Sequence, residues 1–107
     1  MRITEQIINA QIDRLNRLAG QPPAPYKRVS GLPATKANPT GTTTEPCPGN
    51  YHLDHAYGGV CLHQMAPSGG VEDVFRCGHV PKRELYERIS AFIDGYQQAL
   101  DDHNPEG

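Results

Sequence analysis

Four residues of the types that bind zinc form two motifs of equal spacing, Cys61-x-His63 and Cys77-x-His79. Thiolate sulfur and imidazole nitrogen are common ligands of structural zinc sites. Residues two apart in a β-strand point to the same side, so each motif can present both ligands on one face of a sheet. These residues predict a small zinc-binding module as an alternative. Most such modules use closely spaced Cys pairs, and the chain has none, so we expect no cofactor.

A second group of reactive side chains alternates with apolar residues in the same region. If Asp54 lies opposite His63 on neighbouring strands, its carboxylate can orient the imidazole, and Cys61 nearby is a nucleophile by type. Cysteine catalysis also needs a cleft, an oxyanion donor and a thiolate-stabilising group, and no motif supplies them. We therefore predict that the protein is not an enzyme and that this sheet face binds a partner. The face contains His52, Asp54, His63, Met65 and Arg76, with Cys61, Glu72 and Val74 beside them.

Two basic pairs are the third candidate feature. Lys27-Arg28 follows Tyr26 in a Pro-rich stretch, and Lys82-Arg83 opens a predicted helix, where cations oppose the helix dipole. The whole chain has ten Lys+Arg against twelve Asp+Glu and a net charge of −2, so no overall positive field attracts nucleic acid. Nucleic-acid binding is disfavoured, and a regulator that contacts nucleic acid through Lys82 and Arg83 remains a second alternative. We expect Tyr26, Lys27 and Arg28 to extend the binding surface.

Two amphipathic helices must flank these residues. Over residues 4–19 the apolar side chains recur three and four positions apart, with Thr4 as the cap and Gly20 as the end. The polar side chains between them, Asn16 included, are predicted to face outward. The apolar positions are Ile7, Ile8, Ile12, Leu15, Leu18 and Ala19.

The second helix covers residues 81–101, with Pro81 in its first turn and Gly95 as a weak point. Asn104-Pro105 is predicted to end it. Its apolar positions are Leu85, Tyr86, Ile89, Phe92, Ile93, Tyr96 and Leu100.

Residues 20–50 form a predicted Pro/Thr-rich loop, because they hold seven of the ten prolines and cannot supply a packed face. Within it, residues 26–29 can add a short edge strand, although prolines on both sides weaken it. A stretch of this length without secondary structure is typical of a binding loop or a flexible tether.

Residues 51–79 predict a three-stranded antiparallel meander with turns at Gly58-Gly59 and at residues 67–70. The first turn pairs Asp54 with His63, and the second pairs Leu62 with Phe75. Both registers place the same apolar side chains on the buried face, and both separate Cys61 and His63 from Cys77, which weakens the zinc alternative. The predicted buried set is Tyr51, Leu53, Tyr57, Val60, Leu62, Phe75 and Cys77.

The predicted fold class is therefore α+β, in which the N-terminal and C-terminal helices pack on one face of the meander. At 107 residues the chain fits a single domain, residues 1–107, with a thin core. The opposite sheet face is left uncovered by the helices. It is the predicted surface for a partner or for a homodimer.

The composition predicts a protein of the cytoplasm. The first residues, Met1-Arg2-Ile3-Thr4-Glu5, carry charge where an export signal needs an apolar run, and no apolar segment has the length to span a membrane. Three cysteines are an odd number, which is typical of a reducing compartment.

Three motifs resemble small proteins encoded by bacteriophages and prophages: NYHLDHAYGG at residues 50–59, GGVEDVF at 69–75 and KRELYERISAFIDG at 82–95. The resemblance covers under half of the chain, and no catalytic residue follows from it. Small phage proteins without enzymatic motifs often bind a host protein and block or redirect it, and anti-CRISPR proteins are one such class. The resemblance therefore implies a non-enzymatic protein that binds a host bacterial protein in the host cytoplasm, for example a CRISPR-Cas or other defence complex.

Overall fold

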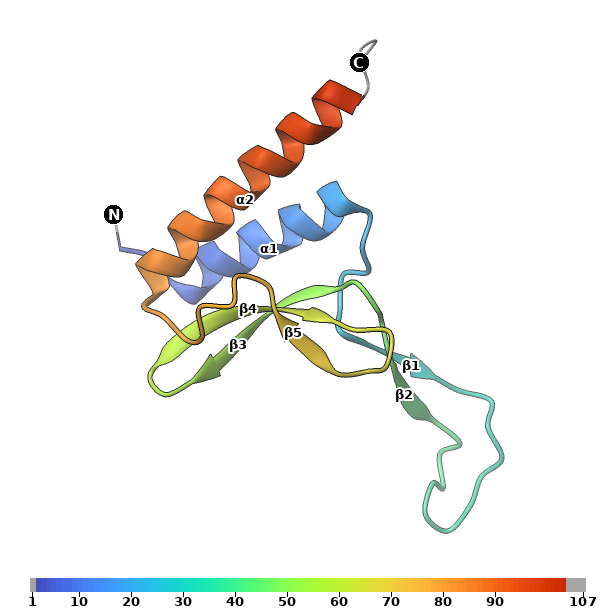
Figure 1. Cartoon of the computed structure of the whole chain (residues 1–107). Coiled ribbons are helices and arrows are strands. Elements are labelled where there is room, and N and C mark those ends of the chain that lie inside the picture. Colours follow the sequence, from blue (N-terminus) through green and yellow to red (C-terminus); the bar gives the residue numbers. More distant parts are fainter. Residues whose placement is uncertain (1, 104–107) are drawn as a thin grey trace.

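In the computed structural model, which describes residues 2–103, two helices cover one face of a three-stranded antiparallel sheet, and a two-stranded ribbon extends away from it (Figure 1). This confirms the predicted α+β class, the meander and the two terminal helices. The elements are α1 (Glu5–Ala19), β1 (Tyr26–Val29), β2 (Thr43–Pro46), β3 (Tyr51–Ala56), β4 (Gly59–Met65), β5 (Val71–Asp73) and α2 (Lys82–His103).

Helix α1 begins and ends where its capping residues predict. The Thr4 hydroxyl accepts a hydrogen bond from the Ile7 N–H at 3.3 Å, and Gly20 ends the helix in the left-handed conformation at φ 68°. The predicted outward position of Asn16 is wrong, since its side chain is only 3% exposed. Its amide donates to the Tyr51 carbonyl oxygen at 2.9 Å and accepts from the Tyr51 N–H at 2.8 Å. Asn16 therefore joins α1 to β3 through a pair of buried hydrogen bonds.

Helix α2 follows Pro81, whose carbonyl oxygen accepts from the Leu85 N–H at 3.1 Å. The helix does not stop at Gly95 but continues to His103. The predicted stop at Asn104-Pro105 lies outside the described residues. Within residues 2–103, no helix is long and apolar enough to cross a membrane.

The hydrophobic core lies between the two helices and one face of the sheet. Helix α1 packs on β3 and α2 packs on β4 (Figure 1). Burial of apolar side chains in this layer supplies most of the driving force for folding. The buried members are Ile3, Ile8, Ile12, Leu15, Tyr51, Val60, Leu62, Val80, Leu85, Ile89 and Ile93.

The first hairpin turns one residue earlier than predicted. Tyr57 and Gly58 both have positive φ, 54° and 74°, as a two-residue hairpin turn of this hand requires. Asp54 therefore pairs with Cys61, and His52 pairs with His63. The predicted pairing of Asp54 with His63 is wrong by two residues. Because the shift is an even number, the side chains within β3 and β4 keep their predicted faces. The predicted burial of Tyr57 is wrong, because the earlier turn contains this residue and leaves it 98% exposed.

The second hairpin differs from the prediction by one residue, and this shift does change faces. His63 pairs with Asp73 and Met65 pairs with Val71, so Asp73 joins the histidine face. Strand β5 ends at Asp73 instead of continuing to Cys77. The chain then loops away and rejoins β4 on the side of β5, where Val80 forms an isolated bridge with Val60.

Two short strands lie within the predicted loop of residues 20–50. The marginal strand at Tyr26–Val29 is present, and its antiparallel partner is Thr43–Pro46, a strand that the sequence did not predict. The residues between the two strands are irregular, as predicted. We call residues 26–46 the arm. The radius of gyration of 16.8 Å exceeds the roughly 13 Å of a compact domain of this size, in keeping with an arm that extends from the body (Figure 1).

Candidate functional site

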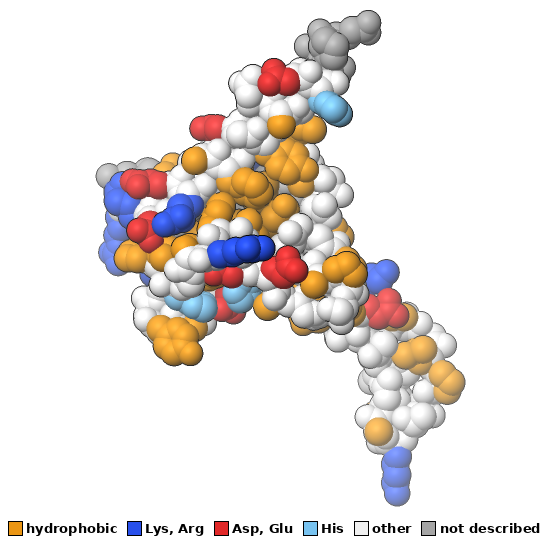
Figure 2. Space-filling model, in the orientation of Figure 1, with side chains coloured by type: hydrophobic (Ala, Val, Ile, Leu, Met, Phe, Trp, Pro, Cys, Tyr) orange, Lys and Arg blue, Asp and Glu red, His pale blue; other side chains and the backbone are white. Residues whose placement is uncertain are grey.

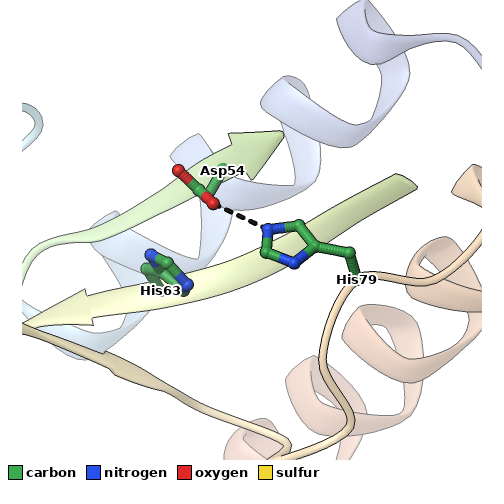
Figure 3. Close-up of side chains that lie close together, drawn as sticks. All are labelled: Asp54, His63 and His79. Carbon is green, nitrogen blue, oxygen red and sulfur yellow. Dashed lines mark hydrogen bonds and ion pairs between the residues drawn. The ribbon is translucent and has the colours of Figure 1, made fainter. Parts of the chain in front are cut away.

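Asp54, His63 and His79 meet on the sheet face opposite the helices (Figure 3). Asp54 comes from β3, His63 from β4, and His79 from the segment before α2. One ligand atom from each side chain lies within 4.8 Å of the other two. His79 Nε2 and Asp54 Oδ2 are 2.7 Å apart and form a hydrogen-bonded pair. Two imidazoles and a carboxylate in this arrangement can bind a metal ion or hold a proton between them.

His79 is held in place by the next residue, Val80, which exchanges two backbone hydrogen bonds with Val60 of β4. The Val60 N–H donates to the Val80 oxygen at 2.8 Å, and the Val80 N–H donates back at 2.9 Å. Glycine at position 59 favours the bridge, because a Cβ there would lie 3.0 Å from the Val80 oxygen and 3.1 Å from the His79 carbonyl carbon, closer than most Cβ contacts. Gly59 thus lets the chain approach β4 closely enough for His79 to reach Asp54.

His63 lies among aromatic rings. Its ring centroid is 5.8 Å from that of His52 and 6.2 Å from that of His79, and both contacts are edge-on. On the far side, His52 Nδ1 lies 3.2 Å from the Asn50 side-chain oxygen. Asn50 is itself buried and donates to the Pro22 carbonyl oxygen at 2.8 Å. The cluster is therefore connected through His52 and Asn50 to the segment that follows α1.

The cluster changes the protonation of its members. The hydrogen bond from His79 lowers the pKa of the Asp54 carboxyl below its usual value, and the nearby His63 lowers it further. Burial lowers the pKa of His52, and the proximity of His63 adds to the effect. Burial, followed by the neighbouring Asp73 carboxylate, raises the pKa of the Cys61 thiol to about 12. Cys61 is therefore a neutral thiol at physiological pH, which argues against its role as a nucleophile.

Asp73 shapes the loop that leads to His79. Its carboxylate accepts three backbone hydrogen bonds, from Phe75 at 3.2 Å, Arg76 at 2.9 Å and Gly78 at 2.8 Å. Burial raises the pKa of Asp73, but the hydrogen bonds from Gly78, Cys61 and the other donors lower it by more, so the net direction is downward. The ionised carboxylate is thus part of the folded loop.

We expect Asp73→Asn to weaken the loop and to change the acid sensitivity of the protein. A lowered carboxyl pKa adds stability above the unfolded value, near 4, and that stability is lost as pH falls through the folded pKa. The variant should unfold about 1–2 kcal/mol more easily at neutral pH, because an amide cannot accept all three bonds. The difference should shrink towards pH 2. Urea unfolding at a series of pH values measures it.

Asp13→Asn, which removes an exposed carboxylate from α1, controls for the loss of one charge and should change the unfolding free energy at neutral pH by less than about 0.5 kcal/mol. A constant difference between wild type and Asp73→Asn from neutral to acid pH would contradict the role of the Asp73 charge.

The structure corrects four members of the predicted binding face. Met65 is only 2% exposed and is not available to a partner. The other three lie on the helix side, where they line a depression with Tyr51 and Phe92; they are Glu72, Val74 and Arg76. The face is also less bare than predicted, since Cys61 is buried beneath its polar side chains. A homodimer through this face stays a prediction.

The two basic pairs lie far apart. Lys27 and Arg28 are exposed on the arm, and Lys82 and Arg83 open α2 at the opposite end of the sheet layer (Figure 1). They do not form one basic surface.

The predicted zinc set is only half assembled. His63 and His79 meet, but their third partner is Asp54, whereas Cys61 and Cys77 are not members of the group. Side-chain alternation predicts Asp54 and His63 on one face, and the Cys-x-His spacing predicts His79 as a ligand, but neither pattern groups the three. In the sequence, Gly59 is the residue that could have indicated this group, because its missing side chain permits the close approach of the His79 segment to β4.

No protein-family model, curated protein or solved structure matches the chain. The resemblance to phage proteins therefore stays a prediction.

Proposed function

We propose that this chain is a non-enzymatic, phage-encoded interaction protein whose arm binds a host bacterial protein. The observation that carries the proposal is the arm itself. None of its residues belongs to the hydrophobic core, and Figure 2 shows it as a lobe separate from the body. An extension that buries so little must offset the entropy of its ordering by its own hydrogen bonds or by a partner.

The arm is ordered by contacts within itself. Beyond the β1–β2 ladder, the Leu32 N–H donates to the Gly41 oxygen at 3.0 Å, and Thr35 and Asn38 exchange backbone hydrogen bonds near 3.0 Å. A preformed arm loses less entropy when it binds than a flexible loop does. Each strand of a two-stranded ribbon also has one unpaired edge, at which a partner can add a strand.

The arm offers both apolar and charged contacts. Tyr26 is 52% exposed and Leu32 is 41% exposed, so both side chains are available to a partner. Lys27, Arg28 and Lys36 stand against a single acidic residue of the arm, Glu45, while the whole chain has a net charge of −2. This local excess of positive charge favours an acidic surface on the partner. His52, Asp54 and His63 lie on the body as a second surface, with Lys82 and Arg83 beyond it.

We expect Lys27→Ala/Arg28→Ala to weaken binding to the partner about 10-fold or more, because two charges at the contact are lost. The partner is captured from bacterial lysate on wild-type protein, identified by mass spectrometry, purified, and titrated against each variant. The double substitution should leave folding intact, since the Lys27–Glu45 pair is exposed and 3.9 Å long. Lys82→Ala/Arg83→Ala removes the same charge from α2 and should keep wild-type affinity for the partner.

A second variant changes the arm without changing its charge. Gly41 has φ 64°, and a Cβ there would meet the Leu32 carbonyl oxygen, so Gly41→Ala must disrupt the far end of the arm. The body should remain folded and the affinity for the partner should fall. Equal affinity in wild type and both arm variants would contradict the proposal. Salt-sensitive retention on DNA that is lost in Lys82→Ala/Arg83→Ala would favour the nucleic-acid alternative instead.

The finer proposal, that the partner is a CRISPR-Cas or other defence complex, has its own readout. Phage plating on a host with an active defence system should rise when wild-type protein is expressed and should not rise with Gly41→Ala. Unchanged plating with wild-type protein would exclude the defence system tested.

A further inference from the structure

We propose that Asp54, His63 and His79 bind one divalent transition-metal ion, with Zn²⁺ as the probe. The site is separate from the arm, and its ligands differ from the Cys-containing set that the sequence predicts. Two imidazoles and a carboxylate suit Zn²⁺ and Fe²⁺ better than Mg²⁺ or Ca²⁺, which prefer oxygen ligands throughout.

The ligand atoms are already close to the spacing that a metal requires. With metal–ligand bonds of about 2.0–2.1 Å, the ligand atoms of a tetrahedral site lie about 3.3 Å apart. The three atoms here lie within 4.8 Å of one another, and the Asp54–His79 pair, at 2.7 Å, has to open by about half an ångström. Side-chain rotations alone can make these movements. Binding would replace the hydrogen bond between the pair with two bonds to the metal.

The backbone beneath each ligand is fixed. Asp54 and His63 lie within the β3–β4 ladder, and His79 is held next to the Val60–Val80 bridge. All three side chains are partly buried, and Asp54 keeps 40% of its side chain exposed, so an ion can enter from solvent. Sites built on strands hold their ligands more accurately than sites on loops.

The Asp54–His79 hydrogen bond does not explain why His63 lies beside this pair. Within residues 2–103, the His63 ring contacts two other imidazoles but has no hydrogen-bond partner. It is placed beside the pair with a ring nitrogen available as a ligand (Figure 3). His52, whose Nδ1 lies 3.2 Å from the Asn50 side-chain oxygen, packs edge-on against the His63 ring from the other side and limits its movement.

The test is a titration of the full chain with Zn²⁺ at neutral pH after dialysis against a chelator. We expect one Zn²⁺ per chain, and His63→Ala should raise the dissociation constant at least about 100-fold. His63→Ala leaves the Asp54–His79 hydrogen bond in place, so the fold should survive, and circular dichroism checks it. His55→Ala is the matched control, because His55 lies on β3 with its side chain paired to Glu5, outside the cluster. It should bind Zn²⁺ as the wild type does.

Two further readouts separate this site from its rivals. Zn²⁺ at 100 times its dissociation constant should raise the melting temperature by roughly 10 °C in wild type and not in His63→Ala. Co²⁺ in place of Zn²⁺ should give no thiolate charge-transfer band. Wild-type protein that fails to bind Zn²⁺, or binding that survives His63→Ala, overturns the proposal. Binding lost in Cys61→Ser and Cys77→Ser but kept in His63→Ala would show a thiolate site instead.

Discussion

Asn16→Ala should lower the free energy of unfolding by about 3 kcal/mol, because the substitution leaves the N–H and C=O of Tyr51 buried without partners. A small domain has only about 5–15 kcal/mol of net stability, so the loss is a large part of the total. The expected fall in melting temperature is roughly 15 °C. Urea unfolding followed by circular dichroism measures the free energy directly.

Asn9→Ala is the matched control, since Asn9 lies on the same helix and is exposed. Alanine favours the helix slightly more than asparagine does, so Asn9→Ala should unfold within about 0.5 kcal/mol of wild type. If Asn16→Ala lowered the free energy of unfolding no more than Asn9→Ala does, the two hydrogen bonds to Tyr51 would not stabilise the packing of α1 on β3.

Gly59→Val should destabilise the fold by about 2–3 kcal/mol and also displace His79. The Cβ of a valine at this position would lie 3.0–3.1 Å from backbone atoms of His79 and Val80. These atoms are part of the hydrogen-bonded bridge, so they cannot move away as the end of a flexible side chain could. We expect the Asp54–His79 hydrogen bond to be lost, and with it the affinity for Zn²⁺ of the proposed site, although no ligand has changed. Unfolding in urea and the imidazole signals in nuclear magnetic resonance report the two effects separately.

The neighbouring glycine supplies the control. A Cβ at Gly58 meets no atom within 4 Å, and its φ of 74° is a conformation that asparagine adopts readily. Gly58→Asn should therefore stay within about 1 kcal/mol of wild type and leave the His79 signals unchanged. Wild-type stability and unchanged His79 signals in Gly59→Val would mean that the bridge is not what positions the histidine.

Periodicity was enough to predict both helices and the face of β3 and β4 that is buried. The buried face of the two strands depends on side-chain alternation, which a two-residue shift of register does not alter. Periodicity could not predict that Asn16 is buried, because a polar side chain is normally expected outside the core. Its burial follows only from its hydrogen bonds to the N–H and C=O of Tyr51. The Thr43–Pro46 strand was missed for a related reason, since its stability comes from pairing with Tyr26–Val29 and not from an apolar face.

The candidate site was predictable only in parts. Alternation placed Asp54 and His63 on one face, but the position of His79 depends on where β5 stops and on how the chain returns to β4. Both depend on single atoms, namely the Asp73 carboxylate oxygens that accept from the loop and the missing Cβ of Gly59. No periodic pattern records such contacts, and for this reason the predicted ligand set contained two cysteines in place of Asp54.

The arm leaves and rejoins the body at a single point, where Tyr26 pairs with Pro46 and the Cys47 N–H donates to the Pro25 oxygen at 2.8 Å. Because its two ends are adjacent, its length and composition can vary without moving α1 relative to β3. If the arm binds the partner as we propose, mutations between these ends alter that contact and leave the core of the body unchanged. The arm is thus a module that can be exchanged for another hairpin while the body keeps its fold.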